Sequence, residues 1–428
     1  MFGANMKMTK KIKGILFLLS AVLSSAGADL YKPHRIFEIG SDTEVLAANS
    51  HFKLDEIMVK DLVIDVKDWY DSMPDKGLSF ATHASEKAFM NVNATSHVRL
   101  SFFTGAEVNG YFNLDKELFR ILAEGTDLNE DEKFELNFYG DAFYDAGFSF
   151  QTLIRDFGVK ISPAVYVPLI YVRPTTASAH LEMSEDGRIS AKAEAPVKIF
   201  TAIDMKGTFD GDDDDEDEEE SEEWYDEISA AELLRNAGFD LSFEVERNFF
   251  HGFNASVFGR IPILPGKLKH KMTTNLSAYF YETNALGIIE GEDIEAHDFD
   301  YDTDDFEYSD ANEKVFRPLR LGLQASYRPF GEWITIKPRL NFVLRDPYSS
   351  DIQFFPEYDL TAELSLFEII GLSIGTGYDY KIFSQHLGIM LNLRAIEILA
   401  KVSLASTDFV NSFKYAGAGG FVGVRIGF

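Results

Sequence analysis

The stretch Phe421-Val422-Gly423-Val424-Arg425-Ile426-Gly427-Phe428, at the end of the chain, alternates between apolar and small or polar side chains. In a β-strand, successive side chains point to opposite faces. The even-numbered residues here would form an apolar face, and Gly423, Arg425 and Gly427 would form a face suited to water. The stretch therefore predicts a membrane β-strand, with the last strand of a soluble sheet as the alternative.

The same stretch resembles the C-terminal targeting strand that the barrel-assembly machinery of the outer membrane recognises in diderm bacteria. Gly423, Ile426 and Phe428 fit that pattern, and Phe421 does not. The resemblance implies the assembly machinery and the outer-membrane lipid bilayer as partners.

The first residues of the chain have the composition of a secretory signal. Basic residues from Lys7 to Lys13 precede an apolar run over 15–23, and the small residues Ala26-Gly27-Ala28 follow. This pattern predicts a signal peptide over 1–28, with cleavage after Ala28. The sequence contains no Cys, so it holds neither a lipid-modified cysteine nor a disulfide framework.

Composition excludes one class of partner and one way of crossing a membrane. The formal net charge of −30 makes nucleic acid an unsuitable partner, because the phosphate backbone is itself anionic. Beyond the signal, no apolar run approaches the roughly 20 residues that a spanning helix needs. A chain of this kind can cross a membrane only as a closed barrel, which pairs every backbone group internally. The 38 Phe and 18 Tyr suit aromatic girdles, and equally a large β core.

Two segments have helical rather than alternating periodicity. Apolar residues recur at helical spacing over 53–72, within a segment at 29–95 that we predict to be a plug or a periplasmic segment. A helix packed on the end of the barrel is the alternative. A second helix is expected at 114–124, where Gly125 would end it.

From His97 onward the sequence alternates in long runs, whereas strands in soluble sandwiches average about 5–6 residues. The expected strands cover 97–112, 136–151, 157–172, 176–184, 188–205, 237–247, 251–281, 314–328, 333–345, 354–367, 370–381, 386–394, 396–406 and 416–428.

The lengths of the connections support a barrel with one orientation. Counted back from Phe428 in the periplasm, the short turns fall on the periplasmic side and the longest connections fall outside, as in outer-membrane barrels. This assignment of turns and connections to the two sides requires 251–281 to be one long strand. The sequence thus predicts an all-β fold, a 14-stranded antiparallel transmembrane barrel over 96–428 with acidic extracellular loops at 206–236 and 282–313.

The two acidic loops are the most unusual segments by composition. Residues 209–227 hold 14 Asp or Glu, and residues 290–313 hold 12. Such runs are usually solvated. Ca²⁺ binding is the alternative, because this ion takes six to eight oxygen ligands, although no fixed ligand spacing is present. We expect no other cofactor or metal.

Alternation also predicts which charged residues line the lumen. The expected lining residues are Arg320, Arg328, Lys337, Arg339, Arg345, Arg394, Lys401, Arg425, Asp359, Glu363, Asp379 and Glu397. The excess of cations suits an anionic solute. Mutual pairing across strands, which binds nothing, is the alternative.

The sequence carries no recognisable catalytic motif: it lacks a Gly-x-Ser-x-Gly elbow, a His-Glu-x-x-His pair and a phosphate loop. We therefore predict no catalytic residues and a protein that is not an enzyme. A barrel hydrolase is kept as a third hypothesis, because a Ser/His/Asp set cannot be chosen without geometry.

The chain from about 97 to 428 is similar to uncharacterised outer-membrane barrels, distantly of the long-chain fatty-acid transporter type. The similarity is carried by 114–125, Ala237-Gly238-Phe239-Asp240-Leu241 and the end from Arg317 to Phe428. It implies 14 strands, an N-terminal plug and passage of small hydrophobic molecules. The expected function is therefore a passive channel for small hydrophobic or anionic compounds; the alternative is a surface-exposed structural or adhesive barrel whose acidic loops bind partners or divalent cations.

Overall fold

The computed structural model describes most of the chain beyond its first 34 residues. The described residues are 35–52, 66–95, 97–124, 132–183, 188–205, 230–250, 252–284, 299–303, 307–331, 333–348, 352–367, 369–414 and 416–428. The predicted signal peptide and its cleavage site after Ala28 lie outside them, as do most of the two acidic loops.

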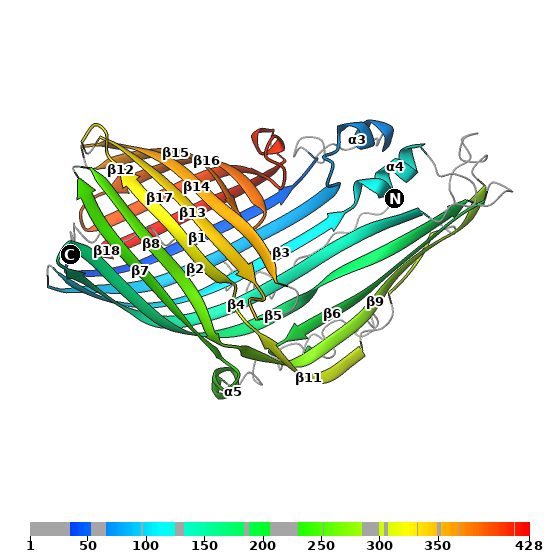
Figure 1. The fold of residues 1–428 in the computed structure, drawn as a ribbon, viewed down its shortest axis with the longest axis horizontal. Helices are drawn as coiled ribbons and strands as arrows, with labels where there is room; N and C mark the ends of the chain where they lie inside the picture. Colours follow the sequence, from blue (N-terminus) through cyan, green and yellow to red (C-terminus); the bar gives the residue numbers. More distant parts are fainter. Residues whose placement is uncertain are drawn as a thin grey trace, which may run out of the picture.

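Fourteen of the strands form a closed antiparallel ring (Figure 1). In ring order they are β1 (Phe37–Asn49), β2 (Leu78–Thr95), β3 (Val98–Leu114), β4 (Glu132–Ile154), β5 (Phe157–Met183), β7 (Gly238–Phe250), β8 (Phe253–Leu264), β12 (Leu319–Tyr327), β13 (Ile334–Arg345), β14 (Gln353–Leu366), β15 (Ile370–Asp379), β16 (Ile382–Asn392), β17 (Ile396–Ser406) and β18 (Gly417–Gly427). The ring closes where β1 pairs with β18, from Glu38 opposite Gly427 to Ala48 opposite Gly417. The predicted all-β, 14-stranded barrel is confirmed.

The remaining four strands form a projecting sheet beyond the barrel. They are β6 (Arg188–Thr201), β9 (Gly266–Asn284), β10 (Phe299–Thr303) and β11 (Glu307–Val315). The first half of β5 pairs with β7, whereas its second half pairs with β6, which in turn pairs with β9. Figure 1 shows β6 and β9 running away from the end of the barrel that carries the C-terminus.

The fork between barrel and projecting sheet is built around Tyr166, whose side chain is fully buried. Its hydroxyl oxygen lies 2.9 Å from the Leu264 carbonyl oxygen and 3.1 Å from the Val315 carbonyl oxygen. The same oxygen accepts the Gly266 N–H at 3.3 Å. One side chain therefore joins three segments at the point where the strands change partners.

The outer face of the barrel wall is apolar although it is exposed. Side chains such as Leu323, Ile374, Leu387 and Val402 are 51%, 60%, 57% and 67% exposed. The inner face is the reverse, because its polar residues, such as Glu107, are buried. A wall of this polarity fits lipid outside and a polar lumen inside, as in transmembrane barrels.

Aromatic side chains gather at both ends of this apolar band. We call the end where β18 finishes the C-terminal rim, and the opposite end the far rim. The exposed Phe330, Trp333 and Phe367 lie in turns at the C-terminal rim. At the far rim the rings of Tyr378 and Phe383 stack with centroids 4.2 Å apart. The Trp333 and Tyr378 rings, which have an apolar body and a polar edge, suit the two interfaces of a bilayer.

The last strand lies as its alternation predicts. Ile426 and Phe428 are exposed on the outer face, whereas Phe421 is buried on the inner face. A Cβ on Gly423 would lie 2.6 Å from Asp42 Oδ1, so the inner face needs a glycine there. The role of Gly423, Ile426 and Phe428 as a targeting signal stays a prediction.

Residues 29–95 require a correction, because the described part of this segment builds barrel wall rather than a plug. It supplies β1 and β2, and β1 pairs with both β2 and β18. Their outward residues, such as Ser41, Thr43 and Ala84, are small or polar, so the contrast between the faces is weak. For this reason the alternation of the sequence did not identify β1 and β2 as strands.

The helices at the far rim also differ from expectation. Of the predicted helix at 53–72, the described part is α3 (Val66–Ser72). It packs against α4 (Lys116–Glu124), which confirms the helix expected at 114–124. Met73, Leu78 and Phe119 form their shared core, and both helices lie together in Figure 1. Among the described residues no helix is long and apolar enough to cross a membrane.

The number of barrel strands was predicted correctly, but two of the fourteen were misassigned. The expected strands at 176–184 and 188–205 lie in the projecting sheet, as the second half of β5 and as β6. The expected strand at 251–281 is wrong, because it divides at Pro265 into β8 and β9. Proline lacks the N–H that would continue the ladder.

The argument from connection lengths is wrong in its requirement that 251–281 be one strand, but the side that it gives for the longest connections agrees with the structure. Two segments build the projecting sheet: one runs from β5 through β6 to β7, and the other runs from β8 through β9–β11 to β12. Both leave the barrel at the far rim and return to it there. A further short helix, α5 (Ala230–Arg235), precedes the return into β7. The described residues that flank both acidic loops therefore lie on the side opposite the C-terminal rim.

Candidate functional site

The lumen is crossed by a group of buried ionic and aromatic side chains. We call this group the constriction, and it consists of Glu107, Asp141, Arg317, Arg320, Arg345 and Tyr380. These residues come from β3, β4, β12, β13 and the segments that precede β12 and β16. Strands β3 and β12 are five places apart in the ring of fourteen, so contacts between them cross the lumen.

Arg317, just before β12, is the centre of the ionic network. Its guanidinium nitrogens lie 3.1 Å from Asp145, 3.2 Å from Asp240 and 3.3 Å from Glu107. These carboxylates belong to β4, β7 and β3. One cation thus ties three strands together, at a position where its own side chain is only 6% exposed.

Arg320 and Arg345 make two further links across the lumen. Arg320 lies 3.3 Å from Glu357 on the nearby β14 and 3.9 Å from Glu107 on the distant β3. Arg345 on β13 forms an ion pair with Asp141 on β4. Low dielectric strengthens such pairs, and their mutual attraction offsets part of the cost of burying the charges.

The turn between β15 and β16 folds inward and completes the constriction. Tyr380 and Lys381 have φ angles of 55° and 65°, a left-handed conformation that non-glycine residues seldom adopt. The Tyr380 ring stacks on His83 of β2, with centroids 3.8 Å apart and planes 11° apart. The Lys381 amine lies 3.9 Å from the ring centroid of Tyr111. This strained turn therefore places an aromatic ring and a cation in the lumen.

Burial and nearby cations make the Lys381 amine of this turn easier to deprotonate. Burial lowers the pKa of Lys381 to about 8, and the charges of Arg345 and Lys76 act in the same direction. Lys381 is thus a cation at neutral pH, and it loses its charge in mildly alkaline solution.

The predicted lumen-lining residues lie mostly on the inner face, where they form pairs. Arg320 and Arg345 belong to the constriction. Arg425 lies 2.5 Å from Glu397, and Arg339 lies 3.0 Å from Asp379. Lys337 lies 2.7 Å from Glu363, and both side chains are partly exposed.

The other predicted lining residues have different surroundings. Asp359 accepts a hydrogen bond from Thr361, and the Lys401 amine lies over the Phe421 ring. Arg328 follows β12 in the turn to β13, where its N–H donates to the Gly252 carbonyl. Arg394 is exposed in the turn between β16 and β17, so it lies outside the lumen.

Sequence reasoning missed the carboxylates that form ion pairs with Arg317 and Arg345. Glu107, Asp141, Asp145 and Asp240 lie on strands whose alternation is weaker than that of the C-terminal third, and Arg317 lies just outside a strand. The pairing of these residues across the lumen depends on ring closure, which one sequence does not show.

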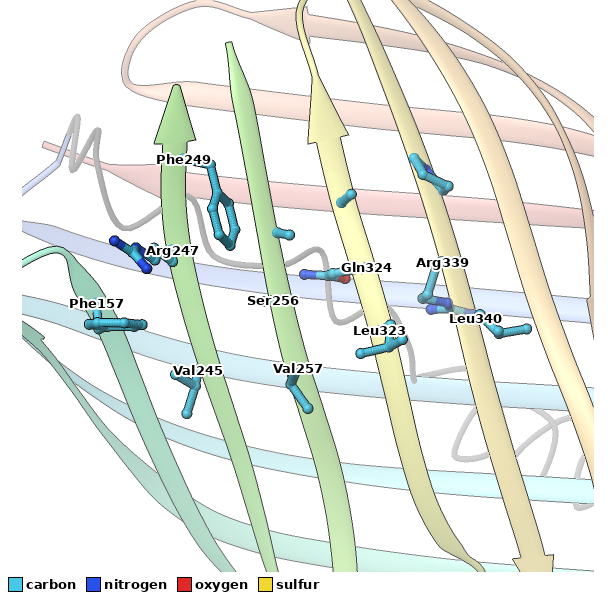
Figure 2. A pocket seen from close by; sticks show the side chains of 13 residues that line it. Phe157, Val245, Arg247, Phe249, Ser256, Val257, Leu323, Gln324, Arg339 and Leu340 are labelled. Carbon is cyan, nitrogen blue, oxygen red and sulfur yellow. The ribbon is translucent and has the colours of Figure 1, made fainter. Parts of the chain in front are cut away.

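A groove of about 490 Å³ crosses β5, β7, β8, β12 and β13 (Figure 2). Its apolar lining includes Phe157, Val245, Val257, Leu323 and Leu340, all exposed. These residues belong to the outer face, whereas Ser256, Gln324 and Arg339, which also line the groove, belong to the inner face. The lining residues include none of those that form the constriction. Among the described residues, no cluster of three or more His, Asp or Glu could hold a metal ion.

Comparisons with known proteins find similar structures but no similar sequence. No family model and no curated protein matches the sequence. Similar solved structures include the toluene transporter TodX of Pseudomonas putida, at 8% identity and a TM-score of 0.44, covering 96% of each chain. The monoaromatic hydrocarbon channel CymD has 7% identity and a TM-score of 0.44, covering 96% of this chain and 94% of that one.

The toluene transporter TbuX of Ralstonia pickettii has 8% identity and a TM-score of 0.40, covering 92% of this chain and 90% of that one. The predicted resemblance to fatty-acid-transporter-type barrels is confirmed as a likeness to these channels. At such TM-scores the likeness says nothing about a ligand, and the fold rests on the strand pairing.

Proposed function

We propose that the chain is an outer-membrane barrel of a diderm bacterium, and that its lumen passes small compounds by diffusion. The observation that carries this proposal is the reversal of polarity across the closed wall, apolar outside and ionic inside. A wall of this kind is stable only around a polar lumen and within lipid.

The pairing in the constriction refines the predicted substrate. Arg317, Arg320 and Arg345 all lie against carboxylates, so the pairing alternative describes them better than an anion-attracting lining does. We therefore favour small hydrophobic compounds with little net charge over anions. A compound passes when the inward turn at Tyr380 moves aside.

Planar-bilayer conductance and the uptake of small solutes into liposomes test this proposal. The wild type should conduct weakly, and Arg320→Ala should conduct more, because it removes a link across the lumen. The matched control is Arg394→Ala, which removes an exposed arginine in a turn and should leave conductance unchanged. Equal conductance in all three proteins, with no uptake, would contradict a passage through the lumen.

The projecting sheet supports the alternative function, a surface barrel that binds partners or divalent cations. β5 is 27 residues long, whereas about 9–11 residues suffice for a transmembrane strand. The sheet therefore extends far beyond the lipid, and its strands β10 and β11 carry acidic residues such as Asp300 and Glu307. Deleting 209–227 and 290–313 separates the two functions. Calorimetric Ca²⁺ binding and adhesion should be lost and passage should survive; loss of passage with unchanged Ca²⁺ binding would reject this division.

A further inference from the structure

Three buried polar side chains beside the constriction form a connected chain of hydrogen bonds. Ser85 Oγ lies 2.6 Å from His83 Nε2, and His83 Nδ1 lies 2.7 Å from Asn109 Oδ1. Strand geometry explains the arrangement, because His83 and Ser85 are two residues apart on β2 and share a face. Asn109 lies directly opposite His83 on β3.

The neighbours of Asn109 determine which way its amide faces. Its Nδ2 donates to Asp141 Oδ1 at 2.8 Å and to Glu107 Oε1 at 3.2 Å. Ionised carboxylates only accept hydrogen bonds, so the amide nitrogen must face them and Oδ1 must face His83.

This orientation determines the tautomer of His83. Because Asn109 Oδ1 is an acceptor, His83 Nδ1 carries the proton and donates it. In the neutral imidazole Nε2 is then unprotonated and accepts a hydrogen bond from the Ser85 hydroxyl. A serine hydroxyl facing a free imidazole nitrogen, with the imidazole oriented by a third group, is the arrangement of a nucleophile, its general base and a positioning residue.

A cation lies in the same cluster. Arg320 lies over the Tyr380 ring at 4.6 Å, and that ring stacks on His83. The buried Nε of Arg320 has no hydrogen-bond partner among the described residues. Arg320 also lies 3.9 Å from Glu107, the residue directly opposite Ser85 in the pairing of β2 with β3. A positively charged group at this place can stabilise negative charge that develops beside Ser85.

We propose that Ser85, His83 and Asn109 form an esterolytic site in the lumen, which acts on small uncharged esters that enter the barrel. Ser85 Oγ attacks the ester carbonyl carbon while its proton passes to His83 Nε2. The bond from the carbonyl carbon to the alkoxy oxygen breaks, and the alcohol leaves with that proton. Water then gives a proton to Nε2 and attacks the acyl-serine, which releases the carboxylic acid and restores the Ser85 hydroxyl.

This activity is separate from passage through the barrel, and it is tested on the full-length protein in detergent micelles. The probes are phenylmethylsulfonyl fluoride, with the adduct located by mass spectrometry, and p-nitrophenyl acetate, with hydrolysis followed by absorbance. We expect an adduct on Ser85. Ser85→Ala should abolish the adduct and lower hydrolysis by about 100-fold or more, because both nucleophile and proton transfer are lost.

Variants distinguish catalysis from a structural hydrogen-bond network. Ser79→Ala removes another buried serine on the inner face of β2 and should leave both signals unchanged. Asn109→Ala should lower kcat for p-nitrophenyl acetate with little change in KM, which a purely structural role would not do. Tyr380→Ala removes the ring over His83 and should speed labelling by improving access. The absence of an adduct on Ser85 in both the wild type and Tyr380→Ala would overturn the proposal.

Discussion

Arg320 and Leu321 are neighbours in the chain, yet they have opposite surroundings. The Arg320 side chain is 18% exposed and forms ion pairs with Glu357 and Glu107. Leu321 is 42% exposed on the outer face, on the same strand. The inner and outer faces of β12 thus reverse the arrangement of a water-soluble protein, in which leucine is buried and arginine exposed.

The comparison of Arg320 with Leu321 indicates that the inner face suits polar surroundings and the outer face suits lipid. Arg317, Arg320 and Arg345 on the inner face are held by carboxylates from distant strands, so each of these three depends on a closed ring. Residues on the outer face have few neighbours and depend on the medium around them. Substitutions on the two faces should therefore lower the free energy of unfolding for different reasons.

The largest expected effect is on the inner face, at Arg317. Arg317→Ala leaves Asp145, Asp240 and Glu107 buried without their shared cation. We expect the free energy of unfolding to fall by about 3–5 kcal/mol. Urea-induced unfolding in liposomes measures this change, and Arg394→Ala is the control, with an expected change within about 0.5 kcal/mol. Equal effects of the two substitutions would show that the ion pairs of the lumen do not hold the ring.

A somewhat smaller effect is expected on the outer face, at Ile374. Ile374 is 60% exposed, so Ile374→Arg would be harmless in water. In the middle of a bilayer it should cost about 2–4 kcal/mol, because the guanidinium is transferred into hydrocarbon. The control is Phe367→Arg, in an exposed turn at the C-terminal rim, where the cost should be about 0–1 kcal/mol. Similar small costs at both positions would mean that the outer face is not in lipid.

The smallest effect concerns pH and Lys381, on the inner side of the far rim. Its pKa is about 8 in the folded protein, below the value of an unfolded lysine, so the unfolded state binds more protons between these two values. The free energy of unfolding should therefore rise from about pH 8 to about pH 10.5, by an amount on the order of 1–3 kcal/mol. Lys381→Met should remove this rise in urea titrations, and an unchanged slope would mean that another group is responsible.

The C-terminal third of the fold could be predicted from sequence, because its two faces differ sharply. In β14, Leu360 and Ala362 alternate with Asp359 and Thr361, and the structure keeps that order. The N-terminal strands could not be recognised in this way. β2 carries Glu86 on its outer side, hydrogen bonded to Ser41, which weakens the periodicity.

The candidate sites were predictable only in part. Alternation identified cations such as Arg320 and Arg345 but gave no partners for them, because the partners lie on strands far away in the sequence. His83 and Ser85 were not identified from the sequence, because 29–95 was not recognised as strand. Their significance depends on Asn109, which only the pairing of β2 with β3 brings opposite His83.

The closure of the ring is the central claim, and a cysteine cross-link tests it most directly. The chain contains no cysteine, and Ile39 on β1 lies opposite Ile426 on β18, with both side chains on the outer face. Directly opposed residues are within reach of a disulfide, whereas residues four positions out of register are not. Mild oxidation should link Ile39→Cys to Ile426→Cys in the folded protein, and should not link Ile39→Cys to Val422→Cys. Failure of the first pair, or equal linking of both, would contradict a barrel closed between its first and last strands.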